Sequence, residues 1–199
     1  MTDATQAPSA RRTELLELAY AYALEHGLAD LSLRPIAAAV GSSPRVLLYL
    51  FGSKDGLVRA LLARARADEL ALLDRAGDGG DDDQDTLTVV AGQLWGWLTA
   101  EEHRPLLTLW VEGYARSLVD PDGPWASFAG GTVDDWLAVL ATAQPRDERD
   151  TAAGTVRRTA ILAVLRGALL DLLATRDIDR TTAAVDQQLS RLRRRDVTA

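Results

Sequence analysis

The fold is decided by residues 31–57, which read LSLRPIAAAVGSSPRVLLYLFGSKDGL and contain two short helical patterns on either side of a glycine. Apolar residues recur at positions 33, 36, 37 and 40, one face of a first helix, with Ser32 as its expected N-cap. Gly41 ends this helix, since glycine tolerates a positive φ. Ser43 caps the second helix, Pro44 fits its first position, and positions 46, 47, 50 and 51 form its apolar face. The arrangement predicts a helix-turn-helix, although a helical hairpin in an ordinary core shows the same pattern.

The order and spacing of several small motifs in this stretch favour the helix-turn-helix over the helical hairpin. Ile36-Ala37, Gly41-Ser42-Ser43 and Phe51-Gly52-Ser53-Lys54 follow one another as they do in the N-terminal domain of the tetracycline-repressor (TetR) family, which this region resembles. The family usually has tyrosine where this chain has Leu48, and Tyr49 lies one place later. The resemblance implies that the second helix is a recognition helix for the major groove of DNA.

The resemblance covers residues 12–62 closely and the rest of the chain in outline, and it implies an all-α fold. Residues 1–53 are expected to form a three-helix helix-turn-helix DNA-binding domain, in which a helix over residues 9–25 braces the two short ones. Residues 54–199 are expected to form a helical ligand-binding and dimerisation domain. A helix from residue 54 to about residue 75 would connect the head to this body and transmit a ligand signal.

Composition places the chain among globular proteins and removes several classes of function. Of 199 residues, 47% are apolar and 26% are charged. No apolar run approaches the ~18 residues of a membrane span, and the first ten residues lack the basic and apolar regions of a secretion signal. The absence of cysteine excludes disulfides and thiolate metal sites, so a cytoplasmic location is expected. Because no G-x-S-x-G, Walker or H-E-x-x-H motif occurs, we expect neither catalysis nor a cofactor.

The net negative charge of the chain argues against a nucleic-acid partner, because nucleic acids are themselves negatively charged. The net charge is −7, all of it in residues 76–199, while residues 1–75 carry nine cations and nine acids. A basic patch therefore requires the cations of the head to converge while Glu14 and Glu17 face elsewhere. The cations concerned are Arg11, Arg12, Arg34, Arg45 and Lys54. The alternative is a helical interaction protein with a TetR-like fold that no longer reads DNA.

The function we predict is a ligand-responsive transcriptional regulator, a repressor that binds a palindromic DNA operator as a homodimer and is released by a small-molecule effector. Arg45 is the expected base reader, because a guanidinium can bond guanine O6 and N7 together. Five of the other candidates are expected to bond phosphates and fix the register, namely Ser32, Arg34, Ser43, Tyr49 and Lys54. The full DNA-binding set is Ser32, Arg34, Ser43, Pro44, Arg45, Tyr49 and Lys54.

A glycine- and aspartate-rich segment, residues 77–85 (GDGGDDDQD), marks the clearest boundary after the head. Its spacing does not fit the D-x-D-x-D-G pattern of a calcium loop, so no metal site is predicted. Beyond it, apolar periodicity predicts helices over residues 87–99, 102–118, 125–143, 147–175 and 181–193.

All five tryptophans lie between positions 95 and 136, within the predicted helical body. Aromatic residues at helical spacing are commonly core residues, but large rings beside glycines are also what an apolar cavity between helices needs. Trp95 and Trp97 cannot share one environment, since two residues span about half a helical turn. The candidate effector-binding residues are Trp95, His103, Trp110, Tyr114 and Trp136. They favour an apolar or aromatic effector, while the acidic body would also suit a cation.

The last two predicted helices are candidates for subunit contact. The helix over residues 147–175 is apolar on most sides and must be covered on most sides, and the final helix is amphipathic. Together with the family resemblance, this predicts that two helices from each subunit form a four-helix bundle; the alternative is a monomer core. The interface candidates are Leu162, Leu165, Leu169, Leu173, Val185 and Leu189.

Overall fold

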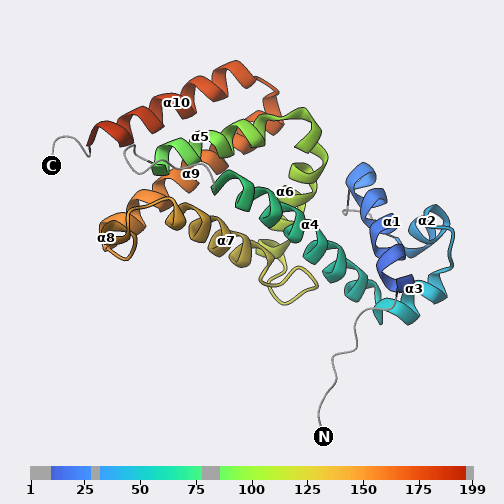
Figure 1. The fold of residues 1–199 in the computed structure, drawn as a ribbon. Helices are drawn as coiled ribbons and strands as arrows, with labels where there is room; N and C mark the ends of the chain where they lie inside the picture. The colour runs from blue at the N-terminus through green and yellow to red at the C-terminus, as the bar shows by residue number, and fades with distance from the viewer. Residues whose placement is uncertain (1–9, 28–31, 78–85, 196–199) are drawn as a thin grey trace, which may run out of the picture. The chain divides into compact units, whose positions relative to one another are not determined.

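The computed structural model describes residues 10–27, 32–77 and 86–195, and every regular element within them is helical (Figure 1). The predicted all-α fold class is confirmed. The described chain forms two compact units, the first comprising residues up to Arg66 together with Glu112–Ala129. The second comprises Ala67–Val111 and the residues from Gly130 onward. The predicted division between residues 53 and 54 concerns function and stays a prediction.

The first unit begins with three helices that pack in chain order. They are α1 (Ala10–His26), α2 (Leu33–Ala39) and α3 (Pro44–Phe51), with α2 contacting both of its neighbours. The unit also contains the beginning of α4 (Lys54–Gly77) and the end of α6 (Arg104–Val119). These bounds match the helices predicted from the sequence, including the long helix that begins at Lys54.

Helix α1 buries one face of its surface. Leu15, Ala19 and Ala23 are buried, and Gly27 ends the helix with φ +76. Leu18 is exposed, whereas Tyr20 is buried. The Tyr20 ring also receives the guanidinium of Arg64 at 5.0 Å from its centroid.

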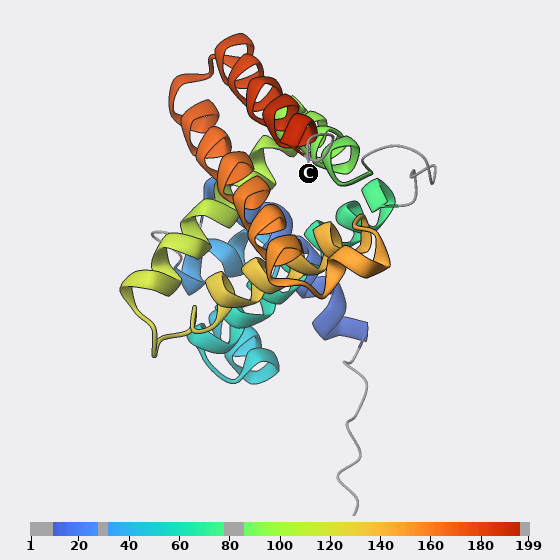
Figure 2. The same cartoon turned by 90° about the vertical axis from the view of Figure 1, so that its left-hand side faces the viewer.

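The second unit is built around α9. Helices α5 and α10 both pack on α9 and on each other, and Figures 1 and 2 show α10 alongside α9. A short 3-10 turn, η1, leads from α5 into α6. The elements of this unit that lie beyond α4 and α6 are α5 (Thr86–Thr99), η1 (Glu101–His103), α7 (Phe128–Thr142), α8 (Arg146–Arg149), α9 (Ala152–Thr175) and α10 (Ile178–Arg195).

The predicted helix over residues 147–175 is wrong in one respect, because the chain breaks it into α8 and α9. Thr151 caps α9, its Oγ1 accepting a hydrogen bond from the Gly154 amide at 2.9 Å. A Cβ at Gly154 would overlap the carbonyl oxygen of Glu148, so the two helices approach closely only because residue 154 is glycine. The break lies at a threonine cap that apolar periodicity does not register.

The predicted helix over residues 125–143 begins later than expected. Helix α7 starts at Phe128, and Ser127 before it has a left-handed conformation with φ 62. Trp125 is buried in the preceding turn rather than on a helix. The glycine- and aspartate-rich boundary falls almost wholly on residues 78–85, which lie outside the described part of the chain.

Candidate functional site

The turn after α2 is closed by its own backbone. Gly41 has φ +61, the conformation for which glycine was expected here. Its amide donates to the carbonyl oxygen of Ala38 at 3.2 Å, and the Ser42 amide donates to that of Ala37 at 2.8 Å. This pair of bonds satisfies the last carbonyl groups of α2 and fixes the direction in which the chain leaves it.

Helix α3 begins as the sequence predicts. The Oγ of Ser43 accepts a hydrogen bond from the Val46 amide at 3.3 Å, and Pro44 occupies the first helical turn. Ser32 occupies the same position before α2, with extended backbone, but its side chain makes no capping bond. Ser32 therefore occupies the predicted N-cap position of α2, but it does not make the predicted side-chain hydrogen bond.

The inner face of α3 is anchored to α1. Leu47 and Phe51 are buried, and Arg12 reaches the end of the helix from α1. The Arg12 Nε donates to the Leu50 carbonyl oxygen at 3.2 Å, and its guanidinium lies 5.0 Å from the centroid of the Phe51 ring. A cation at a helix C-terminus is electrostatically favourable, so Arg12 contributes to positioning α3.

The outer face of α3 exposes large side chains. Tyr49 is 85% exposed, and Arg45 and Leu48 are also exposed. Val46 was expected on the inner face but is 38% exposed, because a helix of eight residues directs only Leu47 and Phe51 fully inward. Single exposed apolar residues are common, but Val46, Leu48 and Tyr49 are close neighbours on one short helix, and a contiguous exposed patch of this kind indicates a surface for a partner.

Residues 32–54 carry three cations and no acidic residue. Arg34, Arg45 and Lys54 are all exposed, and none of them forms a hydrogen bond or ion pair with a described residue. The balanced charge of residues 1–75 conceals this basic segment, although the sequence alone contains the signal. The helix-turn-helix segment is locally basic within a head that is neutral overall.

The acids of α1 that seemed to oppose a basic patch are paired. Glu14 accepts a hydrogen bond from Arg11 at 2.8 Å, and Glu17 accepts one from Arg64 at 2.7 Å. Both pairs begin on α1 and leave the three cations of residues 32–54 uncompensated by any described neighbour. Arg11 and Arg12, which were expected to join the patch, are instead used within the head.

The junction between α3 and α4 places Lys54 at the start of a helix. Gly52 ends α3 with φ +78, and the Oγ of Ser53 accepts a hydrogen bond from the Gly56 amide at 2.9 Å. A Cβ at Gly56 would overlap the carbonyl oxygen of Phe51. This capping serine was not identified from the sequence, although a serine directly before a helical pattern is the usual signal.

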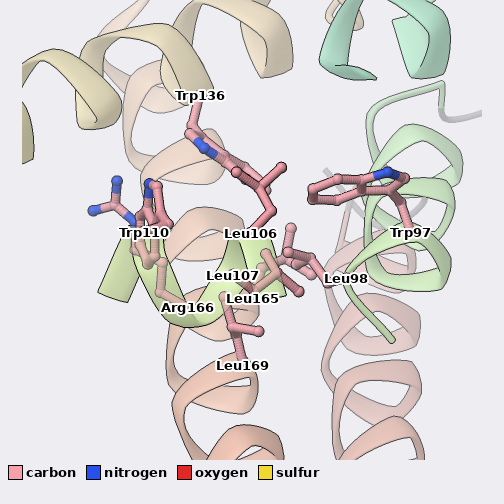
Figure 3. Close-up of a pocket in the computed structure, with 9 residues that line it drawn as sticks. All are labelled: Trp97, Leu98, Leu106, Leu107, Trp110, Trp136, Leu165, Arg166 and Leu169. Atoms are coloured by element: carbon pink, nitrogen blue, oxygen red, sulfur yellow. The ribbon is translucent and has the colours of Figure 1, made fainter. Parts of the chain in front are cut away.

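The second unit contains a cavity lined by tryptophan and leucine side chains (Figure 3). Trp97 of α5 and Trp136 of α7 point toward one another with Leu106 between them. Its volume is about 10 Å³, room for no more than a single water molecule. The lining residues are Trp97, Leu98, Leu106, Leu107, Trp110, Trp136, Leu165, Arg166 and Leu169.

Two of the five predicted effector-binding residues, Trp110 and Trp136, line this cavity. Trp95 is buried outside it and donates through Nε1 to the Oγ1 of Thr182 on α10 at 3.0 Å. Trp97, which sequence analysis did not select, takes its place. The signal was available, since Trp95 and Trp97 were predicted to face different environments.

The other two predicted residues lie beside or away from the cavity. His103 stacks on Trp97 with ring centroids 4.3 Å apart, and its Nδ1 hydrogen bonds to the Trp97 carbonyl oxygen at 2.9 Å. It therefore supports a lining residue without lining the cavity itself. Tyr114 lies on the part of α6 that belongs to the first unit.

The predicted interface residues on α9 and α10 are mostly covered by their own chain. Leu162, Leu165 and Leu169 are buried, as are Val185 and Leu189. They pack where α5, α9 and α10 meet, so they are not available as a surface for a second subunit. Leu173 is half-buried. Their burial within the chain favours another face of α9 for the subunit contact, and the position of that contact stays a prediction.

A family model described as "Bacterial regulatory proteins, tetR family" matches residues 15–61, from the middle of α1 into α4. The HTH-type transcriptional regulator Rv1816 of Mycobacterium tuberculosis is 30% identical over 143 residues, which are 70% of this chain and 61% of that protein. Residues 15–61 form a domain of the TetR family. Proteins of this family are transcriptional regulators, which confirms the expectation that the chain is not an enzyme. The chain spans about three fifths of the length of the curated relatives it matches.

Solved structures show the same fold over nearly the whole chain. A transcriptional regulator from Rhodococcus sp. Rha1 has a TM-score of 0.72 at 21% identity, covering 91% of this chain and 95% of that one. The multidrug binding protein EbrR, solved in complex with imidazole, has a TM-score of 0.68 at 24% identity, covering 96% of each chain. At these identities the likeness establishes the fold.

Two further features of the described residues bear on function. None of the helices in residues 10–27, 32–77 and 86–195 combines the length and the apolar character that a membrane span needs. The same residues contain no group of three or more histidine, aspartate or glutamate side chains arranged to hold a metal ion.

Proposed function

We propose that this protein binds a palindromic DNA operator as a homodimer, acts as a repressor and is released by a small-molecule effector. The observation that carries the proposal is the surface of residues 32–54, which has three unpaired cations, no acid and a capped helix with large exposed side chains. Lys and Arg neutralise phosphates and release counterions, the main source of affinity for duplex DNA. A rigid helix beside them is suited to the major groove.

Base reading is assigned to the outer face of α3. Arg45 is exposed near its N-terminal end, and its guanidinium can donate two hydrogen bonds to guanine O6 and N7. Val46 and Leu48 have no polar group to offer, but apolar side chains contact the methyl group of thymine. We therefore expect each operator half-site to combine a guanine with at least one thymine.

Phosphate contacts are assigned to the residues that flank α3. Lys54 and Arg34 are exposed cations, and Tyr49 offers a phenolic hydroxyl. Ser32 and Ser43 can donate their hydroxyl hydrogens, since the Ser43 oxygen acts only as an acceptor in its capping bond. Pro44 contributes a fixed φ at the start of the helix. These contacts fix the register of the helix without selecting a sequence.

The homodimer is assigned to the uncovered face of α9. Val156 and Leu170 are 69% and 52% exposed, and the exposed Ala163 and Gly167 lie between them on the same side of the helix. This side is opposite the residues that contact α5 and α10, so α9 is apolar on both faces as the sequence indicated. A second copy that covers this face would complete the expected helical bundle.

Effector binding is assigned to the tryptophan cavity. EbrR is described as a multidrug binding protein, and here Trp97, Trp110 and Trp136 offer three aromatic faces at one point. The cavity is almost filled in this conformation, so a ligand of useful size must displace the side chains that line it. Such a ligand binds a second arrangement more tightly than the first, which is the requirement for shifting a conformational equilibrium.

The decisive experiment is selection of duplex DNA from a random pool by the purified full-length protein at about 150 mM salt, where electrostatic binding without sequence preference is weak. We expect an inverted repeat. Arg45→Ala should weaken binding by about tenfold or more and relax the sequence preference at one position of each half-site, since one bidentate contact contributes about 1–3 kcal/mol. Lys54→Ala should weaken binding to all duplexes alike.

Two outcomes would overturn the DNA-binding assignment. Recovery of no motif, with residual binding that fades as salt increases, would favour the helical interaction protein that is the alternative reading of this fold. A motif that survives Arg45→Ala unchanged would remove Arg45 from base reading. Arg191→Ala, at an exposed position on α10, is the matched control and should leave selection unaltered.

The dimer is tested by sedimentation equilibrium of Leu170→Glu, which puts a charge on the uncovered face of α9. We expect dissociation, because an interface cannot bury an unpaired carboxylate without a large desolvation cost. The control is Leu118→Glu, at an exposed leucine of α6 outside this face. Equal dissociation of both variants, or of neither, would reject α9 as the interface.

A further inference from the structure

A second, larger cavity adjoins the tryptophan cavity in the same unit, and its lining includes charged side chains. Leu98 and Leu107 line both cavities, so the two spaces share these leucines. We call the larger space the outer cavity and the tryptophan cavity the inner one. The outer cavity has a volume of about 150 Å³, a size that in other proteins accepts a benzene-sized molecule. Its lining residues are Leu98, Thr99, Ala100, Glu101, Arg104, Leu107, Leu172, Leu173, Arg176 and Ile178.

The charged groups of the outer cavity leave one cation uncompensated. Arg104 is bound by Glu101 at 2.6 Å, which neutralises that pair. Arg176 is exposed at the cavity, and its guanidinium forms no hydrogen bond or ion pair with any described residue. The outer cavity therefore has a net positive charge within a part of the chain that is acidic overall.

Arg176 ends α9 in the left-handed region, with φ 60 and ψ 17. Glycine is the usual residue in this conformation, which is strained for residues that have a Cβ. An arginine at a helix end also interacts favourably with the helix dipole, so the test must separate that structural role from ligand binding.

The turn that carries Arg176 is held in place by its neighbours. Arg180 donates to both carboxylate oxygens of Asp171 at 2.7 Å and to Asp177 at 3.2 Å, which ties the end of α9 to the start of α10. The two nearby acids are therefore engaged by Arg180 rather than by Arg176. The Arg176 guanidinium remains available at the cavity with its five donors.

We propose that the outer cavity binds a small organic acid, with its carboxylate on Arg176 and its apolar, ring-sized body against Leu98 and Leu107. Arginine is suited to a carboxylate because its planar group can donate two parallel hydrogen bonds. The two leucines offer the apolar surface that the body of such an acid needs, and they also line the tryptophan cavity. The effector is therefore expected to be an anion, whereas the acidic composition of the body alone would favour a cation.

The acid is the effector in the sense of the proposed function, and this part of the inference rests on that function. A ligand seated on Leu98 and Leu107 presses on the wall of the tryptophan cavity, so it can bias the side chains that line both spaces. The binding of an acid does not depend on DNA, and it is measured on the protein alone.

The test is isothermal titration of the full-length protein with phenylacetate, with the neutral phenylacetamide and with the cationic 2-phenylethylamine. We expect phenylacetate to bind about tenfold or more tightly than phenylacetamide, as a charge-assisted bidentate contact provides, and 2-phenylethylamine to bind weakest. Arg176→Gly should bring the acid and the amide to within about twofold, while Arg176→Lys should keep part of the preference because it keeps the charge.

Arg176→Gly separates ligand binding from a structural role. Glycine relieves the left-handed strain, so the variant should fold and be at least as stable as the parent. If Arg176 served the fold alone, this variant would change stability and leave the preference for the acid intact. Arg191→Gln, about 20 Å farther along α10, is the charge-matched control and should bind all three probes as the parent does.

Three results would overturn the proposal: equal binding of acid and amide, retention of the acid preference in Arg176→Gly, or no binding of any probe. Failure of the proposed function gives a different pattern. If duplex selection recovers no operator while phenylacetate still binds through Arg176, the DNA-binding assignment is lost and the anion site stands. If an operator is recovered and phenylacetate binds without weakening its complex, the site is not the effector site.

Discussion

The helix-turn-helix segment and the tryptophan cavity are organised by different kinds of interaction. Around α3 the decisive contacts are local, since Gly41, Ser43 and Ser53 act on residues no more than five positions away. Around the cavity they are distant: Trp95 is bonded to Thr182, which is 87 positions later in the chain. Local rules determine the first region, and packing between helices determines the second.

The difference also concerns what each region exposes. The helix-turn-helix buries two side chains of α3 and presents the rest to solvent, with cations that no described residue compensates. The cavity region buries Trp110 and Trp136 and half-buries Trp97, leaving a space of about 10 Å³. A rigid exposed surface is suited to a partner of fixed shape such as duplex DNA. A filled cavity is suited to a ligand that changes the conformation on binding.

The largest expected effect comes from a methyl group placed at the α3–α4 junction. Gly56→Ala would put a Cβ on the carbonyl oxygen of Phe51, and we expect a loss of about 2–3 kcal/mol in the free energy of unfolding because backbone must move. Gly92→Ala on α5 is the control: no side chain lies near its Cβ, so a gain of about 0.5–1 kcal/mol is expected from helix propensity. Urea unfolding followed by circular dichroism measures both.

This pair of substitutions tests the local construction of the reading head. If Gly56→Ala is as stable as the parent, the junction is not tightly constrained, and the position of Lys54 is not fixed by it. If both variants gain stability, the contrast between a constrained junction and an open helix surface is lost.

The local construction explains why the head could be predicted from the sequence. Gly41, Ser43 and Pro44 carry their structural meaning in their own conformational preferences, and each lies where the sequence placed it. The local positive charge of the head could not be predicted from its net charge, because the net charge is summed over all 75 residues. The acid-free segment of residues 32–54 was hidden by acids on α1 that pair with Arg11 and Arg64.

The body could be predicted only to the level of its helices. Periodicity identified the tryptophans as a cluster, but which of Trp95 and Trp97 faces the cavity depends on where α10 packs, and no local rule contains that information. The same limit applies to α9. The sequence predicts that α9 is apolar on most sides and must be buried on most sides. It does not reveal that α5 and α10 of the same chain cover one of those faces.

A smaller effect compares the two neighbouring tryptophans directly. Trp95→Phe removes the donor to Thr182, and Trp97→Phe removes an indole nitrogen that has no hydrogen-bond partner in the described structure. Trp95→Phe loses a hydrogen bond that Trp97→Phe does not, and Trp95 is the more buried of the two, so Trp95→Phe should be the more destabilising by about 1 kcal/mol or more. Unfolding is followed by far-ultraviolet circular dichroism, because the substitutions alter the fluorescence. Equal losses would mean that the Thr182 bond does not distinguish the two positions.

The smallest effect concerns pH and the turn that carries Arg176. The hydrogen bonds from Arg180, with the charge of that guanidinium, hold the pKa of Asp171 below its ordinary value. A carboxyl group whose pKa is lower in the folded state stabilises the fold above the pKa of the unfolded chain, about 3.9, and this contribution is lost as pH falls through the folded value. The parent should therefore exceed Asp171→Asn in thermal midpoint at pH 6, and the difference should vanish toward pH 2.5. The pair is exposed, so the difference is small and should shrink in high salt. A difference that persists at pH 2.5 would assign the effect of Asp171→Asn to packing and leave the α9–α10 turn without its electrostatic tie.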